Sequence, residues 1–194
     1  MSKISFTNKS QSVSNPLPDV NQFKATDANQ IKDSVNALYN VAGWVEYKDL
    51  TNTISNKQTL TASQENTLTI DGASTIKTYK PQNMGTAELW SGNKIRPLAL
   101  GDFYNARIDF TAEIANADGY FDIGIYIDGS IGYAVKNVER FPKGNGVAHG
   151  FSLNYPIYCL ETFMANGGEI RITPSHTMLI WGKRIILNRT FSNV

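Results

Sequence analysis

Few residues in this chain combine the type and the spacing that catalysis or metal binding requires. The histidines, His149 and His176, are separated by a full predicted strand and have no carboxylate close by in the sequence, so they form at best a weak metal site. A serine nucleophile on a sharp strand-to-helix turn needs the pattern Gly-x-Ser-x-Gly, which the chain lacks. We therefore expect no enzymatic activity, no catalytic or metal-binding residue and no cofactor.

Carboxylates and one cysteine offer the remaining chemistry. Asp118, Asp122 and Asp128 are closely spaced, as in a paired-acid or calcium site, but the DxDxDG pattern with a trailing glutamate is absent. Asp118 and Asp128 fit turns, and Asp122 fits the outward face of a strand. Cys159 lies in an apolar run and is expected to be a small buried side chain. As the sole cysteine, it excludes an intrachain disulfide.

Aromatic side chains offer a different kind of function, the binding of another surface. Tyr126, Tyr133 and Tyr155 lie in predicted strands and are our candidates for surface or interface aromatics. Such rings either stack on sugars or pack between subunits along a symmetry axis. We favour packing between subunits, because subunit interfaces are enriched in aromatic residues. A glycan remains the alternative partner.

Strands are the elements expected to position most of these residues. Apolar and polar residues alternate along 105–115 and 120–129, so each segment has one face suited to a core. The segments 96–100 and 157–164 are further strand candidates. Antiparallel strands without intervening helices predict a mainly β fold, an antiparallel β-sandwich of the jelly-roll type. The side chains expected to point inward are Ile108, Phe110, Ala112, Ile114, Phe121, Ile123, Ile125 and Ile127.

Residues 27–42 carry helical spacing instead. Their apolar residues recur at alternating steps of three and four, which is the a/d stripe of a helix that packs on copies of itself. The helix is expected to begin near Thr26 or Asp27 and to end at Gly43. The alternative is a helix that packs against the base of the β-rich part of its own chain. The stripe, which we predict to form a trimeric neck, consists of Ala28, Ile31, Val35, Leu38 and Ala42.

The first 24 residues show no periodicity. They are rich in serine, asparagine, glutamine and proline and hold too few apolar residues to fold alone. Isolated hydrophobic residues within them would anchor an extended arm to a partner surface. We therefore expect an arm over 1–25, a helical neck over 26–43 and a head over 44–194. The anchoring residues are predicted to be Phe6, Leu17, Val20 and Phe23.

Charge and hydropathy exclude several partners. The 194 residues carry a formal net charge of +1, and no cluster of lysine and arginine forms a basic stripe. Neither nucleic acid nor an anionic membrane is therefore an expected partner. The N-terminal residues lack the apolar stretch of a signal peptide, and no run of 18 apolar residues occurs. We expect neither a secretory leader nor a membrane span, and assembly in the cytoplasm.

Two parts of the chain resemble known phage proteins. Residues 18–32, PDVNQFKATDANQIK, resemble the N-terminal attachment segment of virion proteins from phages that infect Bacteroidota, including crAss-like phages. The stretch FYNARIDFTAEIANADGYFDIGIYIDGS, followed by VERFPKGNG and FMANGGEIRIT, resembles the jelly-roll heads, of the TNF and complement type, that phage fibres carry.

The resemblance implies a homotrimeric virion protein. Its arm would dock into the major capsid protein or another virion protein, and its TNF-like head would be displayed outward, where it could attach to the host surface. One short helix as the shaft favours a head fibre or spike on the capsid surface over a long tail fibre. A capsid decoration or cement protein with the same arm is the nearest alternative, and a carbohydrate-binding module is another.

Overall fold

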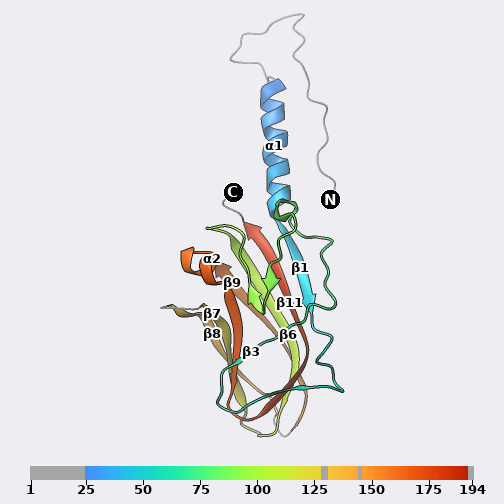
Figure 1. Cartoon of the computed structure of the whole chain (residues 1–194), viewed down its shortest axis with the longest axis vertical. Helices are drawn as coiled ribbons and strands as arrows, with labels where there is room; N and C mark the ends of the chain where they lie inside the picture. Colours follow the sequence, from blue (N-terminus) through green and yellow to red (C-terminus); the bar gives the residue numbers. More distant parts are fainter. Residues whose placement is uncertain (1–24, 128–130, 144–145, 192–194) are drawn as a thin grey trace, which may run out of the picture.

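The computed structural model describes residues 25–127, 131–143 and 146–191, and shows a helix standing on one end of a β-rich body (Figure 1). The helices in this part of the chain are α1 (Ala25–Val41), the single 3₁₀ turn η2 (Gln82–Met84) and α2 (Glu161–Asn166). The strands are β1 (Gly43–Lys48), β2 (Gln58–Leu60), β3 (Asn66–Thr67), β4 (Trp90–Ser91), β5 (Lys94–Ile95), β6 (Phe103–Ile114), β7 (Tyr120–Ile127), β8 (Gly132–Arg140), β9 (His149–Tyr158), β10 (Gly168–Pro174) and β11 (Met178–Phe191).

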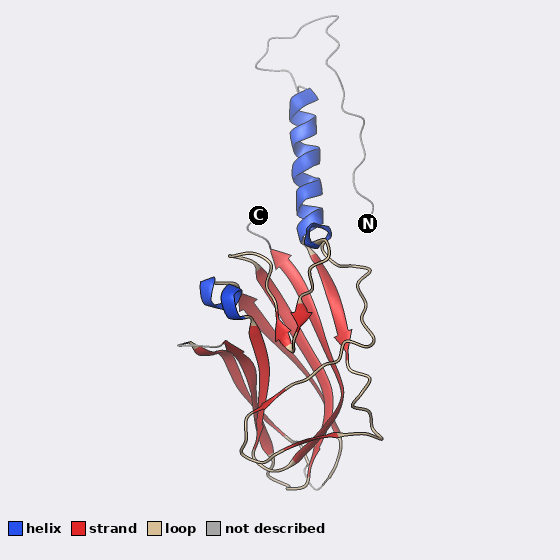
Figure 2. Cartoon of the chain, in the orientation of Figure 1, coloured by secondary structure: helices blue, strands red, loops and turns tan. Residues whose placement is uncertain are grey.

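Within the described residues the strands form two antiparallel sheets, shown in red in Figure 2. The first sheet has the order β1-β11-β6-β9, with β2 also paired to β11. The second has the order β4-β5-β10-β7-β8, with β3 also paired to β10. From β6 onward the chain changes sheet after every strand except β7, which continues into its neighbour β8. This topology is that of a jelly roll, so the predicted mainly β, antiparallel sandwich is confirmed.

The core lies between the two sheets, where alternate side chains of each strand meet. Along β6 and β7 the inward side chains are buried, as the alternation predicts. Each such aliphatic or aromatic side chain contributes about 1.5–3 kcal/mol by leaving water. All eight side chains predicted to point inward are at most 5% exposed: Ile108, Phe110, Ala112, Ile114, Phe121, Ile123, Ile125 and Ile127.

Two of the predicted strands are wrong. Residues 96–100 form an irregular segment, and the N–H of Leu98 donates to the Tyr104 hydroxyl at 3.2 Å instead of to a neighbouring strand. The predicted strand over 157–164 ends at Tyr158, and α2 follows it. Helix α2 ends where the N–H of Gly167, at φ 70°, donates to the Phe163 carbonyl, a conformation that glycine adopts without strain.

A carboxylate holds the loop that follows β1. Asp71 accepts hydrogen bonds from the Thr51 hydroxyl at 2.6 Å and from the backbone N–H groups of Thr51 and Ala73 at 3.1 and 2.8 Å. Desolvation by itself would raise the pKa of Asp71, but these bonds to the charged form lower it from 3.8 to about 2. The ionised Asp71 therefore stabilises the folded state.

The contribution of Asp71 should depend on pH. Because folding lowers its pKa, the stabilisation is complete above pH 5 or so and disappears as the pH falls toward about 2. We expect Asp71→Asn to lower the free energy of unfolding at neutral pH, and the difference from wild type to shrink between roughly pH 5 and pH 2. Urea unfolding across this range measures it. A difference that stays constant with pH would contradict the assignment.

Candidate functional site

Helix α1 stands clear of the sandwich and does not cover its base (Figure 1). Its main contacts with the head are at its C-terminal end, with η2 and β11. The 17 residues of α1 span about 25 Å, and a helix of this length is marginally stable alone in water. The head therefore supplies packing for only one end of this helix.

The predicted apolar stripe lies exposed along this helix. Ile31 is 56% exposed and Val35 is 40% exposed, while Ala28 is half-buried. Ala42 is exposed and follows the last helical residue. The side chain of Leu38 lies outside the described residues, as do the arm residues Phe6, Leu17, Val20 and Phe23. The described chain thus leaves a large part of the stripe in contact with solvent.

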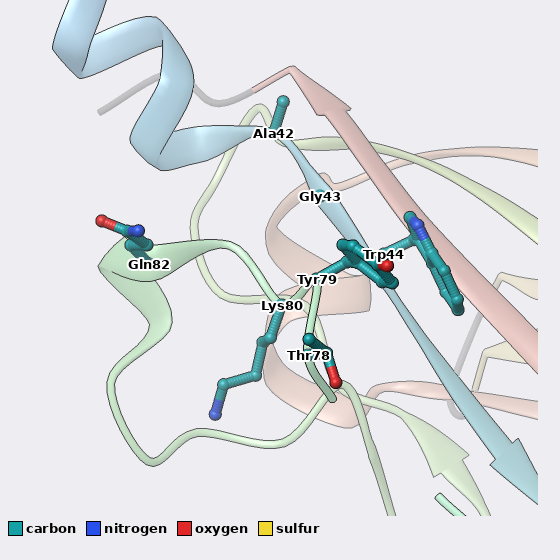
Figure 3. A pocket seen from close by; sticks show the side chains of 7 residues that line it. All are labelled: Ala42, Gly43, Trp44, Thr78, Tyr79, Lys80 and Gln82. Carbon is teal, nitrogen blue, oxygen red and sulfur yellow. The ribbon is translucent and has the colours of Figure 1, made fainter. Parts of the chain in front are cut away.

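A pocket of about 370 Å³ lies where the neck meets the head (Figure 3). The rings of Trp44 and Tyr79 form one wall, stacked with centroids 5.1 Å apart and planes 23° from parallel. The Trp44 N–H donates to the Tyr79 carbonyl at 3.0 Å, so the segment before η2 runs along the outer edge of β1. Gly43 permits this approach, since a Cβ there would lie 2.4 Å from the Tyr79 oxygen.

A buried ion pair beneath this junction was not predicted from the sequence. Arg189 on β11 is 1% exposed and Asp102 is fully buried, with 2.7 Å between Nη2 and Oδ1. The Tyr104 hydroxyl donates to the other Asp102 oxygen at 2.7 Å, and burial, then this bond, raise the pKa of Tyr104. Arg189 also donates to Asn83 in η2 at 2.9 Å. The network therefore joins the core to the element on which α1 rests.

A second buried cation, the Lys183 ammonium, secures the other part of β11. Lys183 is fully buried, and its Nζ lies 3.0 Å from Asp49 and donates to Asn52 at 2.8 Å and to Gln58 at 2.5 Å. Burial lowers the pKa of Lys183, and the Asp49 carboxylate opposes that shift. These contacts bind the long connection between β1 and β2 to the sheet.

The sequence does carry a signal for these basic residues. Along β11 the buried side chains recur at every second position, with one interruption at Gly182 and Lys183, where the register with β6 shifts. Lys183, Ile185, Leu187 and Arg189 then share the inward face. A basic residue in the apolar phase of a strand indicates a buried partner, although it does not say which carboxylate.

The predicted surface aromatics divide into two groups. Tyr126 and Tyr133 meet on the outer face of the second sheet, with centroids 5.4 Å apart. The Arg171 guanidinium lies 3.5 Å from the Tyr126 ring centroid, and Lys136 Nζ lies 5.0 Å from that of Tyr133. Tyr155 is instead fully buried between the sheets, so the suggestion that it lies at a surface is corrected: its position on β9 has the inward phase.

The histidine, aspartate and cysteine residues considered above for catalysis or metal binding do not form a common site in the described part of the chain. The Nε2–H of His149 donates a hydrogen bond to the Lys143 carbonyl oxygen at 2.7 Å, and Asp122 pairs with Lys136 at 2.8 Å. Cys159 is fully buried, and desolvation raises the pKa of its thiol to about 12, which disfavours the nucleophilic thiolate. His176 is exposed beside Ser175, and Asp128 lies outside the described residues.

The described part of the chain has neither a cluster of metal-binding side chains nor a membrane-spanning helix. Nowhere in these residues do three or more histidine, cysteine, aspartate or glutamate side chains gather in a way that could hold a metal ion. Among the described helices, none combines the length and the apolar character needed to cross a membrane.

Comparison with known proteins finds solved structures with low-scoring similarity to this chain. No family model and no curated protein matches the chain. Solved structures with a similar fold include PRD1 vertex protein P5, at 14% identity and TM-score 0.44 over 77% of this chain and 73% of that one. Eiger TNF from S. frugiperda has 4% identity and TM-score 0.47, over 79% and 95%. A chain of the empty Cowpea mosaic virus particle has 10% identity and TM-score 0.29, over 78% and 79%. Viral capsid and vertex proteins and a TNF jelly roll are thus among the structural neighbours.

The buried pair is expected to be essential for stability. Asp102→Asn leaves the Arg189 guanidinium buried without its carboxylate, and we expect the free energy of unfolding to fall by about 3–5 kcal/mol. Denaturant unfolding of the full chain measures this loss. Asp118→Asn, which makes the same change at an exposed position, should stay within about 0.5 kcal/mol of wild type. Equal stability of the two variants would contradict the role given to the pair.

Proposed function

We propose that this chain is a non-enzymatic structural protein of a virion, a short homotrimeric spike or head fibre on the capsid surface. In this proposal the arm binds the major capsid protein or another virion protein, α1 forms the neck and the jelly roll is displayed outward. The observation that carries the proposal is the apolar stripe of α1, which stands away from the head and remains exposed.

The stripe supports association with copies of the same chain. Its steps of three and four are the spacing with which helices interlock around a common axis. Burying Ile31 and Val35 in such a bundle would contribute about 1.5–3 kcal/mol for each side chain, which offsets the marginal stability of an isolated helix. Three copies, rather than two, are proposed from the resemblance of residues 18–32 and of the head to fibre proteins.

The arm supports attachment to a particle. A segment of 24 residues reaches up to about 80 Å when extended, and in a trimer three such arms leave one end of the molecule. Three linked arms bind far more durably than one, because after the first arm binds the others are held close to their sites. A chain assembled in the host cytoplasm would join the capsid in this way.

The predicted surface aromatics Tyr126 and Tyr133 do not favour the alternative of a carbohydrate-binding module. Sugars stack on open faces of aromatic rings, whereas Arg171 and Lys136 already lie over the rings of Tyr126 and Tyr133. A flat cement protein differs from a spike in the position of its head, and electron microscopy of particles separates the two.

Charges placed in the stripe should weaken the trimer. We expect Ile31→Asp with Val35→Asp to raise the dissociation constant of the trimer about a hundredfold or more, because two apolar side chains leave the helix interface. Sedimentation of the full chain over a range of concentrations measures it, with circular dichroism to verify the fold. Gln30→Asp with Ser34→Asp adds the same charge at the same spacing on exposed positions and should leave the trimer unchanged. A wild-type chain that is monomeric throughout would overturn the trimer.

Charges placed in the arm should release the protein from particles. We expect Val20→Asp with Phe23→Asp to abolish co-sedimentation with virions while the native mass of the trimer is kept, because the arm loses two apolar anchors. The control, Asn21→Asp with Gln22→Glu, adds the same charge between the same two positions and should still bind. Loss of the trimer in the first variant would assign the arm to the subunit interface instead.

A further inference from the structure

An apolar groove of about 260 Å³ opens on the side of the head opposite β1. It lies between β8 and β9, beside α2, and every lining residue is apolar or tyrosine. Three of its rim side chains are large and exposed: Ile131 at 49%, Tyr158 at 72% and Leu160 at 63%. A concave apolar surface with exposed apolar side chains at its rim is suited to an apolar side chain of a protein partner.

The strands that flank the groove have unpaired edges. In the described part of the chain, β8 pairs with β7 and β9 pairs with β6, so each strand is the last in its sheet. The opposite edge of the first sheet is different, because the segment before η2 covers β1 there: Ile76 bridges Glu46, and the Tyr79 carbonyl accepts the Trp44 N–H. The edges of β8 and β9 beside the groove are therefore open, whereas the edge of β1 is covered.

The register of the first sheet places the groove level with the base of the neck. Gly43, the first residue after α1 and Ala42, pairs with Arg189, which pairs with Tyr104, which pairs with Ile157 in the groove. Three strand spacings separate Gly43 from Ile157, or about 14 Å. Copies joined through their necks would thus carry their grooves at the same height and close to the common axis.

The covered edge presents an aromatic side chain at this height. Trp44 lies in the same cross-strand row as Pro156 of the groove, through Asn188 and Asn105. Tyr79 stacks on Trp44 with one face and is 59% exposed (Figure 3). A dry apolar cavity of about 150 Å³ admits benzene, so a groove of 260 Å³ has room for a tyrosine ring.

We propose that the groove between β8 and β9 of one copy binds the Tyr79 edge of the neighbouring copy. The inference rests on the proposed homotrimer and identifies the contact between its heads. In this contact the open edge of one copy meets the covered edge of the next, so two different surfaces are joined. A head-to-tail contact of this type can close a ring of three copies. The net charge of +1 leaves little repulsion between copies that bring these apolar surfaces together.

Cysteine cross-linking of the full chain tests the contact. The double variant Tyr79→Cys with Ile131→Cys, treated with a short bismaleimide, should give covalently linked dimers and trimers on a denaturing gel. Mixed chains that carry one substitution each should stop at dimers. The native Cys159 is fully buried, so the wild type and both single variants should remain uncross-linked.

Two results would overturn the proposal. One is the absence of cross-links in the double variant, and the other is a dimer formed by Ile131→Cys alone, which would show that groove faces groove. Light scattering on the same samples separates this failure from failure of the trimer: an uncross-linked trimer rejects the groove contact alone, and a monomer rejects both.

A charge in the groove provides an independent measurement. Leu160→Asp should raise the dissociation constant of the trimer about tenfold or more, because an anion would replace a leucine that the proposed contact buries. Ile54→Asp makes the same kind of change at a side chain that is 70% exposed and lies outside the groove, and it should have no effect. Equal trimer stability in the two variants would reject the contact even if both fold normally.

Discussion

Strand β11 pairs with β1 and β2 on one side and with β6 along most of its length on the other, so three separate parts of the chain depend on its register. Its inward face also carries Lys183 and Arg189, whose buried charges pair with Asp49 and Asp102. A slip of one residue would turn these cations outward and the outward residues into the core. The ion pairs therefore specify the register that apolar packing alone would leave less sharply defined.

The position of the neck follows from that register. Arg189 pairs with Gly43 across the sheet and reaches Asn83 through its side chain, so the end of β11 holds both the start of β1 and the turn that supports α1. Because the helix leaves from this end, its apolar stripe projects beyond the sandwich. The head does not cover this stripe, so in the proposed assembly other copies of the chain would cover it. The register of β11 thus links the core of the head to the proposed assembly.

Local pattern alone predicted the parts that depend on neighbouring residues in the chain. The period of two along β6 and β7 identified the buried faces, and the steps of three and four identified α1 to within two residues at its start. Alternating strands without intervening helices were enough to predict an antiparallel sandwich. These features follow from the sequence because strand and helix periodicities are set by backbone geometry within a few residues.

Tertiary structure alone decided which surfaces face the core and which remain open. Tyr155 was a candidate for a surface or interface because it is aromatic, but it is buried in the core. Tyr158, three residues further along the chain, is exposed at the groove. The partners of Arg189 and Lys183 lie 87 and 134 residues away in the chain. Sequence periodicity says that a side chain is inward or outward, but the pairing of distant strands determines what it meets there, and that pairing depends on the register of the whole sheet.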